Sequence, residues 1–531
     1  MHRFGSLTSR IEAFLLALAA FAALTTGTSD CPANEPVATF SVELDLGADR
    51  GQNFGSLFEV RDAGDRVLAG AGFTEVYNTR FRSDRHTLQF FVRPNKEADR
   101  FSTRRLPHPD LDCGIYLFDF DQELRAWSSV RNNSVRRFDA ARSEWSDAPV
   151  PLTGRVRSGD GIMRLGTGTL TFTSNQVAYD DRIILGAPKI GRYYNFYYAQ
   201  GRLFFYHTHT AETDGFTKIY ACPWTTDSPD PIDLTQATVM RAKYVGATPF
   251  AWGQFRESVL TVSNYGGVYV FDGVAWTALR EAQKGVSYQV YSMLNYHDRL
   301  LLAQYPSGEL FEYRGGDLKH LAGWPPRLPG VSANAREAQT MSIYRGDLFV
   351  GVWPWAEVWR YNRDESRWHS LGRMFTHPQT TDKTTHPYEA QAKQHNLVAN
   401  HWGQRVTGMV SQGSTLMLST STKGTYPWLE KYDFLTDAQR REYGAVIELS
   451  MSGNLATQIK WRDRPITLDF VVEESRLVIR QDGEELADSQ LSFDGARRLT
   501  GSTVRWGRGV FGALNGKLLS KSQDVPRASN K

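Results

Sequence analysis

The chain has 531 residues, 12% of them aromatic, and a formal net charge of +3 at pH 7. Such a balance of charges argues against a protein that wraps nucleic acid or another polyanion. The 45 glycines and many aromatic residues are typical of short strands joined by tight turns. The length exceeds that of one ordinary core, so we expect two structural units.

Residues 1–28 have the pattern of a signal peptide. Arg3 and Arg10 supply positive charge, and the apolar run Ala13–Leu24 is followed by small and polar residues. A membrane anchor is the alternative, but this run is shorter than the roughly 20 apolar residues that span a bilayer. No later segment is apolar enough to span, so we expect a secreted or periplasmic protein without a membrane span.

The three cysteines are Cys31, Cys113 and Cys222. In an oxidising compartment two of them can pair, and we expect the pair to be Cys113 and Cys222. Cys31 follows Asp30, where a lipid-attachment signal needs a small residue, so lipidation is disfavoured. The cysteines are too few and too scattered to form a metal cluster.

The first strands are expected in residues 37–100. Segments such as ATFSVELDLG and TLQFFVRP alternate apolar and polar residues, which is typical of strands that are buried on one face. They do not follow the plan of the segments that come after them.

A repeat dominates residues 110–455. The segments Glu257–Leu279, Asp298–Leu321 and Gly346–Leu371 share one plan: a strand, a turn, a strand with an aromatic residue at its fourth position, a polar turn, and a strand that ends in Leu. Their middle strands begin at Val268, Leu310 and Val358, which are 42 and 48 residues apart. This period is that of four-stranded propeller blades.

The repeat resembles kelch and quinoprotein-like β-propellers over residues 110–455. The resemblance implies an all-β fold with six to eight blades, of which seven is our expectation, and it implies no particular activity. On this reading the aromatic residues of the repeat pack the blades; these are Phe271, Trp276, Tyr313, Tyr361 and Trp368.

The C-terminal segment, residues 456–520, returns to the rhythm of residues 37–100. The turns at Gly55–Gly64, Arg476–Leu486 and Phe511–Leu518 loosely resemble those of a laminin-G or concanavalin-like sandwich. The resemblance implies a β-sandwich made by both ends of the chain, with the propeller inserted into it and a disordered tail at 521–531. The alternative is that both ends are irregular blades that close the ring.

The first group of candidate site residues lies in GRYYNFYY and YHTHT. His207 and His209 are two residues apart on an expected strand, so both side chains share one face. Arg192 and Tyr197 come shortly before them. The alternative is a polar strand end that faces solvent.

The second group lies in an insertion, residues 374–405, which holds four histidines within 32 residues. A His, Tyr and Arg set can transfer protons beside a carboxylate, and His with carboxylate can hold a divalent metal. The spacing matches no zinc motif, so we expect neither a metal nor another cofactor; an ordinary polar lid is the remaining alternative. The candidate binding residues are His377, His386, Tyr388, His401 and Arg405.

Trp353 and Trp355 flank a proline in a blade turn. Exposed aromatic faces suit stacking on sugar rings, and buried turn packing is the alternative.

We therefore expect a monomer that binds an extracellular acidic glycan or a small acidic ligand. As a polysaccharide lyase it would use His207 or His209 as base, Tyr197 or Tyr388 as acid, and Arg192 or Arg405 to neutralise a uronate. The geometry then predicts that both histidine groups line one pocket and that His207 and His209 contribute little to stability. The alternative is a non-catalytic propeller that binds a protein or a glycan.

Overall fold

The computed structural model describes residues 37–78, 81–94, 101–111, 113–128, 134–149, 161–173, 175–424 and 427–526. The fold is all-β, as predicted. The described helices are short, and none is long and apolar enough to cross a membrane. They are η1 Leu234–Gln236, α1 Glu389–Gln394, α2 Asp437–Arg440 and α3 Gly495–Arg498.

Seven sheets carry propeller-like repeats, each with four antiparallel strands. Sheet 1 is β8 Tyr116–Phe120, β9 Glu123–Trp127, β10 Val135–Asp139 and β11 Glu144–Asp147. Sheet 2 is β12 Gly161–Leu165, β13 Gly168–Thr173, β14 Gln176–Tyr179 and β15 Arg182–Leu185. Sheet 3 is β16 Arg192–Ala199, β17 Arg202–His209, β18 Phe216–Pro223 and β19 Thr238–Arg241.

The remaining four sheets follow the same order. Sheet 4 is β20 Pro249–Phe255, β21 Ser258–Ser263, β22 Val268–Phe271 and β23 Trp276–Arg280. Sheet 5 is β24 Gln289–Tyr296, β25 Arg299–Tyr305, β26 Leu310–Tyr313 and β27 Lys319–Leu321. Sheet 6 is β28 Glu337–Tyr344, β29 Asp347–Trp353, β30 Glu357–Asn362 and β31 Arg367–Arg373. Sheet 7 is β32 Arg405–Gln412, β33 Thr415–Ser421, β34 Val446–Ser450 and β7 Ser102–Arg105.

The repeated plan of the sequence corresponds to the second, third and fourth strands of sheets 4, 5 and 6. The aromatic residue at the fourth position of the middle strand is buried in each case: Phe271 is 1% exposed, Tyr313 4% and Tyr361 6%. Phe271 contacts Trp276 and Tyr361 contacts Trp368 across the polar turn. The predicted packing role of this aromatic stripe is therefore confirmed.

Sheet 7 is completed out of sequence order. Its outermost strand β7 comes from before sheet 1 and pairs antiparallel with β34, matching Arg104 with Glu448. Its first strand β32 contacts β8 of sheet 1 and β28 of sheet 6. The last sheet is thus joined to the first by both backbone pairing and packing.

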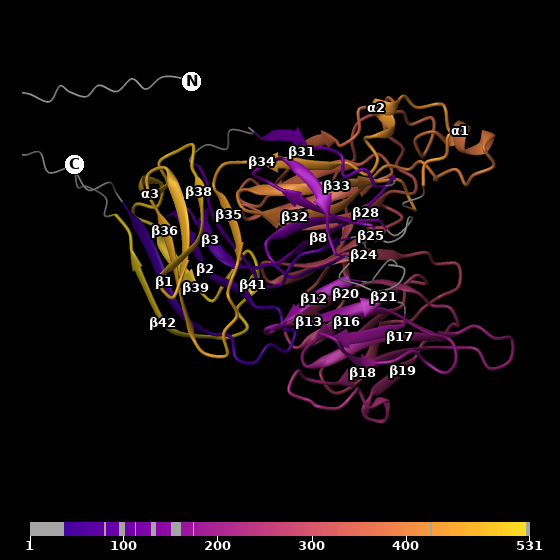
Figure 1. Cartoon of the computed structure of the whole chain (residues 1–531), viewed down its shortest axis with the longest axis horizontal. Coiled ribbons are helices and arrows are strands. Elements are labelled where there is room, and N and C mark those ends of the chain that lie inside the picture. The colour runs from indigo at the N-terminus through magenta and orange to yellow at the C-terminus, as the bar shows by residue number, and fades with distance from the viewer. Residues whose placement is uncertain are drawn as a thin grey trace, which may run out of the picture. The chain divides into compact units, whose positions relative to one another are not determined.

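Two further sheets combine both ends of the chain. One has the order β38-β37-β36-β1-β42 and the other β35-β6-β3-β2-β39. In Figure 1, β1, β36, β38 and β42 lie together. Their bounds are β1 Ala38–Asp45, β36 Ile466–Val472, β37 Arg476–Gln481, β38 Glu484–Gln490 and β42 Lys517–Asp524, then β2 Gly55–Arg61, β3 Val67–Phe73, β6 Thr87–Val92, β35 Asn454–Gln458 and β39 Thr503–Trp506. The short strands β40 Arg508–Gly509 and β41 Gly512–Ala513 pair with each other.

These two terminal sheets share one hydrophobic core. Phe58 of β2 lies 4.9 Å from Phe40 of β1 and 5.1 Å from Phe470 of β36, measured between ring centroids. The pairs β1–β36, β2–β39 and β6–β35 are antiparallel. Strands of residues 37–94 therefore pair with strands from the C-terminal segment, and β42 runs to Asp524, beyond the expected end at 520.

The connection between β3 and β6 leaves the terminal sheets and reaches the seven sheets. It contains β4 Val76–Asn78 and β5 Phe81–Arg82, and we call residues 75–78 and 81–82 the strap. β4 pairs with β24 and contacts β20 and β28, whereas β5 pairs with β8 and contacts β12 and β32. Tyr77 also packs on Tyr197 of β16. The strap thus contacts the first strand of all seven sheets.

A buried carboxyl group anchors the strap. Tyr197 donates its hydroxyl hydrogen to Glu75 at 2.7 Å, and Gln254 donates to both Glu75 oxygens at 3.1 and 3.0 Å. Burial raises the pKa of Glu75. Next along the strap, Asn78 donates to the Gln339 carbonyl of β28 at 2.8 Å.

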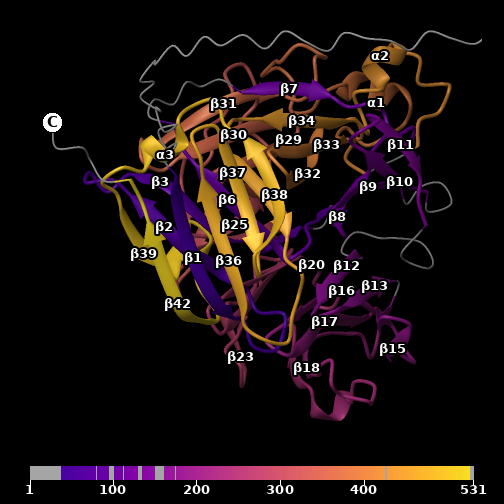
Figure 2. The same ribbon diagram turned by 60° about the vertical axis from the view of Figure 1, so that its left-hand side comes forward.

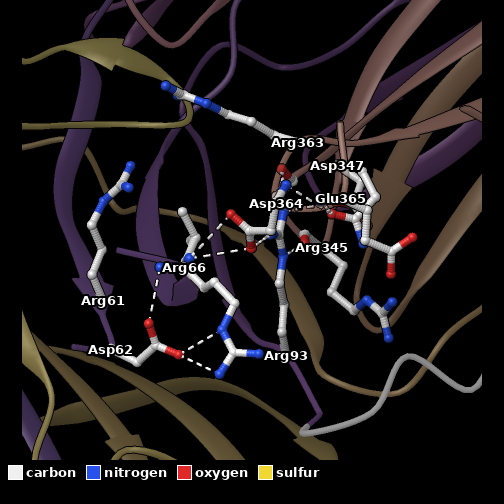
Figure 3. A network of polar contacts seen from close by, with 12 residues as sticks. Arg61, Asp62, Arg66, Arg93, Arg345, Asp347, Arg363, Asp364 and Glu365 are labelled. Atoms are coloured by element: carbon white, nitrogen blue, oxygen red, sulfur yellow. Dashed lines mark hydrogen bonds and ion pairs between the residues drawn. The ribbon is translucent and has the colours of Figure 1, made fainter. Parts of the chain in front are cut away.

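A second connection between the terminal sheets and the seven sheets is an arginine clamp at Arg93 (Figure 3). The Arg93 guanidinium donates to Asp347 at 2.7 Å and to Asp364 at 2.9 Å. It also donates to the backbone carbonyls of Arg345 and Gly346. The Arg93 side chain is 5% exposed and that of Asp347 is fully buried, so both charges depend on partners inside the protein.

The expected disulfide between Cys113 and Cys222 is wrong. The structure contains no bond between them, because Cys113 packs with Tyr344 and Tyr443 whereas Cys222 packs with Leu203 and Trp224 in a different cluster. The signal sequence and Cys31 lie outside the described residues, so their interpretation stays a prediction.

Replacing Arg93 with Met should destabilise the protein by roughly 1.5–3 kcal/mol, because the buried Asp347 carboxylate loses one of its two arginine partners and keeps only Arg360. The matched control is Arg66→Met: Arg66 pairs with Asp62 but is 61% exposed, and such surface pairs contribute about 0–1 kcal/mol. Urea unfolding at neutral pH measures both free energies. Equal losses in the two variants would contradict the clamp.

Candidate functional site

Two long connections interrupt the repeat and pack together. One is residues 374–404, between β31 and β32, and contains α1. The other is residues 422–445, between β33 and β34, and contains α2; residues 425–426 are outside the described part. We call them together the cap (α1 and α2 in Figures 1 and 2). Trp402 and Tyr432 form its buried core, and their ring centroids are 5.0 Å apart.

His377 joins the two connections of the cap. Its Nε2 donates to the Gln439 carbonyl at 2.9 Å, so Nδ1 accepts from the Tyr388 hydroxyl at 2.6 Å. Glu442 lies 3.3 Å from Nε2 and accepts from the Thr376 backbone and hydroxyl. Burial lowers the pKa of His377 in spite of Glu442, and burial raises the pKa of Tyr388 to about 12. This pair is therefore neutral and its hydrogen bonds stabilise the cap.

The other predicted residues of the second group are also tied to neighbours. His386 Nδ1 is 3.0 Å from Glu389, and its ring lies 4.9 Å from that of Trp353. The ring of His401 packs on Trp402 at 4.6 Å.

Arg405 does not face a cavity. It is 2% exposed, and its guanidinium donates to Glu337 at 2.9 Å and to the Lys423 carbonyl at 2.7 Å. Trp353 and Trp355 are each 1% exposed, so their ring faces are covered by protein. The predicted use of these three side chains on a ligand is corrected by their burial.

The first predicted group lies in sheet 3. His207 Nε2 donates to the Ile190 carbonyl at 2.8 Å, and its ring packs between Tyr193 and Phe216. Burial lowers the pKa of His207. His209 is more exposed and lies 3.9 Å from Asp214. The predicted base is thus a neutral ring inside an aromatic cluster.

The proposed acid and neutraliser are also separated from each other. Tyr197 is bonded to Glu75 inside the strap, and Arg192 is exposed with its guanidinium 5.3 Å from the Tyr194 ring centroid. The partners of the first group belong to sheet 3 and the strap, and those of the second group to sheets 6 and 7 and the cap. The structure therefore does not bring the two groups into one pocket.

A cavity beside the cap was missed by the sequence analysis. It has a volume of about 210 Å³, and we call it the cap pocket. Its lining is His108, Asp110, Leu111, Cys113, Trp428, Arg440, Arg441 and Tyr443. These residues come from opposite ends of the repeated region and meet only because sheet 7 contacts sheet 1. The one local signal was the Arg440–Arg441 pair at the end of a helix with a capping box.

The described residues contain no group of three or more His, Cys, Asp and Glu side chains placed to hold a metal ion. In the cap, the ring nitrogens of His377 and Nδ1 of His386 face Tyr388, Gln439 and Glu389. These three ring nitrogens are therefore engaged by protein groups.

Neither a family model nor a curated protein matches this sequence. Solved structures that are similar include a computationally designed protein, Ika8, at 9% identity and a TM-score of 0.36, covering 72% of this chain and 98% of that one. YCF48 bound to D1 peptide matches at 10% identity and a TM-score of 0.37, covering 67% and 99%. BamB from Moraxella catarrhalis matches at 10% identity and a TM-score of 0.32, covering 77% and 96%.

YCF48 and BamB are β-propeller proteins. Identities near 10% and TM-scores below 0.5 leave the function of this chain to be argued from its own residues.

His207→Ala should lower the free energy of unfolding by roughly 2–3 kcal/mol, because it leaves a cavity among aromatic rings and removes the donor of the Ile190 carbonyl. His209→Ala is the matched control two residues away; with 27% of its side chain exposed, its loss should stay within about 0.5 kcal/mol. Urea unfolding distinguishes this packing role of His207 from the sequence-based prediction that His207 contributes little to stability. A His207→Ala variant as stable as the parent would contradict the packing role and support the prediction made from the sequence.

Proposed function

We propose that this protein is a non-catalytic binding protein: a closed seven-bladed propeller, inserted into a sandwich of the two terminal sheets, whose cap binds a protein partner. The observation that carries the proposal is the position of the strap. A segment of six described residues can contact the first strand of seven sheets only if those strands surround it. The axis of the ring is then filled by the chain itself.

An occupied axis restricts where a ligand can bind. The first strands direct the side chains of Tyr197 and Gln254 and the backbone carbonyl of Gln339 toward the strap, so these groups are already hydrogen-bonded. Buried polar groups that leave their partners lose 1–3 kcal/mol each, which disfavours displacement of the strap by a ligand. A partner therefore binds on a face of the ring or on its connections.

The residues that a lyase would need argue against catalysis. Tyr197 bonds Glu75, His207 bonds a backbone carbonyl and Arg405 bonds Glu337. A general base must reach the proton that it abstracts, and these groups are hydrogen-bonded within the protein and do not line the cap pocket. Binding to a glycan loses its expected platform as well, because Trp353 and Trp355 are buried.

The cap is the best surface for a partner. It breaks the repeat, and it carries two exposed apolar side chains, Val398 at 64% and Leu429 at 43%, around an aromatic core. Exposed apolar groups gathered beside such a core are typical of protein-binding surfaces. With the predicted export, the partner would be a protein outside the cytoplasm.

Photo-crosslinking tests this proposal. A photoreactive amino acid at position 398 or 429 should crosslink to one discrete protein in living cells of the source organism. The control position is 274, where Val274 is 80% exposed in the turn between β22 and β23, and it should give no such product. The same products from all three positions, or none from the cap positions, would sink the proposal.

A further inference from the structure

The cap pocket lies where the segment before sheet 1 meets the second connection of the cap. His108, Asp110 and Leu111 form one side, and Trp428, Arg440 and Arg441 form the other. Tyr443 is fully buried at 1% exposure, and Cys113 is buried beside it. We call these two sets of lining residues the first and the second wall, and Tyr443 and Cys113 the buried base.

His108 fixes the first wall and contributes no charge. Its Nε2 donates to the Tyr443 carbonyl at 3.1 Å, and its Nδ1 accepts from the Asp110 backbone at 3.0 Å. Both ring nitrogens are thus occupied in the neutral form. Burial lowers the pKa of His108, and Arg441 acts in the same direction.

The second wall carries excess positive charge. Arg441 donates to Asp110 at 2.8 Å, so the one carboxylate among the lining residues is already paired. Arg440 is 3.5 Å from Asp437, whose side chain is 92% exposed, so solvent screens this pair. The Nε of Arg440 is buried and has no hydrogen-bond partner in the described part of the chain. Because 37% of the Arg440 side chain and 50% of the Arg441 side chain are exposed, the pocket offers guanidinium donors to an incoming anion.

An apolar surface adjoins these donors. The Arg440 guanidinium carbon lies 6.0 Å from the Trp428 ring centroid, and Leu111 is part of the same lining. A ligand that fits both surfaces has an anionic end on a short apolar stem. A carboxylate at the end of an aliphatic side chain has this form.

The size of the pocket decides between a free ligand and an anchoring side chain. Pockets for complete small molecules usually measure about 300–1,000 Å³, whereas this one has about 210 Å³. One side chain of a larger partner fits the smaller volume. Pockets that receive one anchoring side chain are common in protein interfaces.

We infer that the cap pocket binds the carboxylate of a glutamate side chain in a peptide segment of the protein partner, with Arg440 and Arg441 as its donors. The inference rests on the proposed function, since it takes the partner to be a protein. Arginine forms charge-assisted and often bidentate hydrogen bonds with carboxylates, which gives the pocket its preference for this group.

The test uses fluorescence polarisation with the full chain and a labelled octapeptide, Gly-Ser-Leu-Glu-Glu-Leu-Ser-Gly, blocked at both ends. The Glu peptide should bind about tenfold more tightly than its Gln-Gln twin, because only the carboxylate forms charge-assisted hydrogen bonds with the two guanidinium groups. Arg440→Ala and Arg441→Ala should each remove most of this difference. A Gln-Gln peptide whose C-terminal carboxylate is left free should bind with the same low affinity as the blocked Gln-Gln peptide.

The matched control is Arg314→Ala in sheet 5. Arg314 is 49% exposed and pairs with Asp298 at 2.7 Å, whereas Arg441 is 50% exposed and pairs with Asp110 at 2.8 Å. Arg314→Ala should leave the peptide affinity unchanged. Equal affinity for Glu and Gln peptides, equal loss in all three variants, or tighter binding of a phosphoserine peptide would overturn the inference.

The two experiments distinguish failure of the proposed function from failure of the inference about the cap pocket. The crosslinking positions 398 and 429 are outside the lining of the cap pocket. If they still crosslink to one protein while the Glu peptide binds no better than its twin, only the inference about the pocket falls. If the crosslinks are absent, the proposed function falls.

Discussion

Insertion of the strap among seven first strands is the constraint on which the rest of this structure depends. The strap belongs to the terminal sheets, since it joins β3 to β6, yet its hydrogen bonds are made with β8, β16, β20, β24 and β28. The Arg93 clamp lies at the other end of β6. In the proposed closed ring, folding of the terminal sheets and closure of the seven sheets are therefore coupled, because the strap and the clamp both join the two parts.

This coupling also predicts which parts of the chain tolerate change. The first strands face a segment of their own chain and are buried, so changes there cost stability. The connections beyond β31 and β33 face outward and have room to grow into the cap, whose stability comes from its own core of Trp402 and Tyr432. Proteins often carry their binding residues on loops that a rigid scaffold holds in place, and the cap fits this pattern.

Much of the fold could be predicted from the sequence because the repeat is local. The period of 42 and 48 residues and the buried aromatic positions depend only on neighbouring strands. The strap could not be predicted, since Glu75 looks like any polar residue until Tyr197 and Gln254 enclose it. The roles of the histidines were wrongly predicted for the same reason. The sequence shows that His207 and His377 can transfer protons, but only the structure shows that each ring is already hydrogen-bonded.

Hydrogen exchange of the backbone amides of β4 tests the central claim most directly. If the strap fills the axis, Tyr77 and Asn78 should exchange as slowly as their partners Met293 and Ser292 in β24, because both need global unfolding. The exposed edge strand β42 should exchange much faster and serves as the reference. Rapid exchange in β4 while β24 stays protected would mean that the strap leaves the axis, and it would contradict the account.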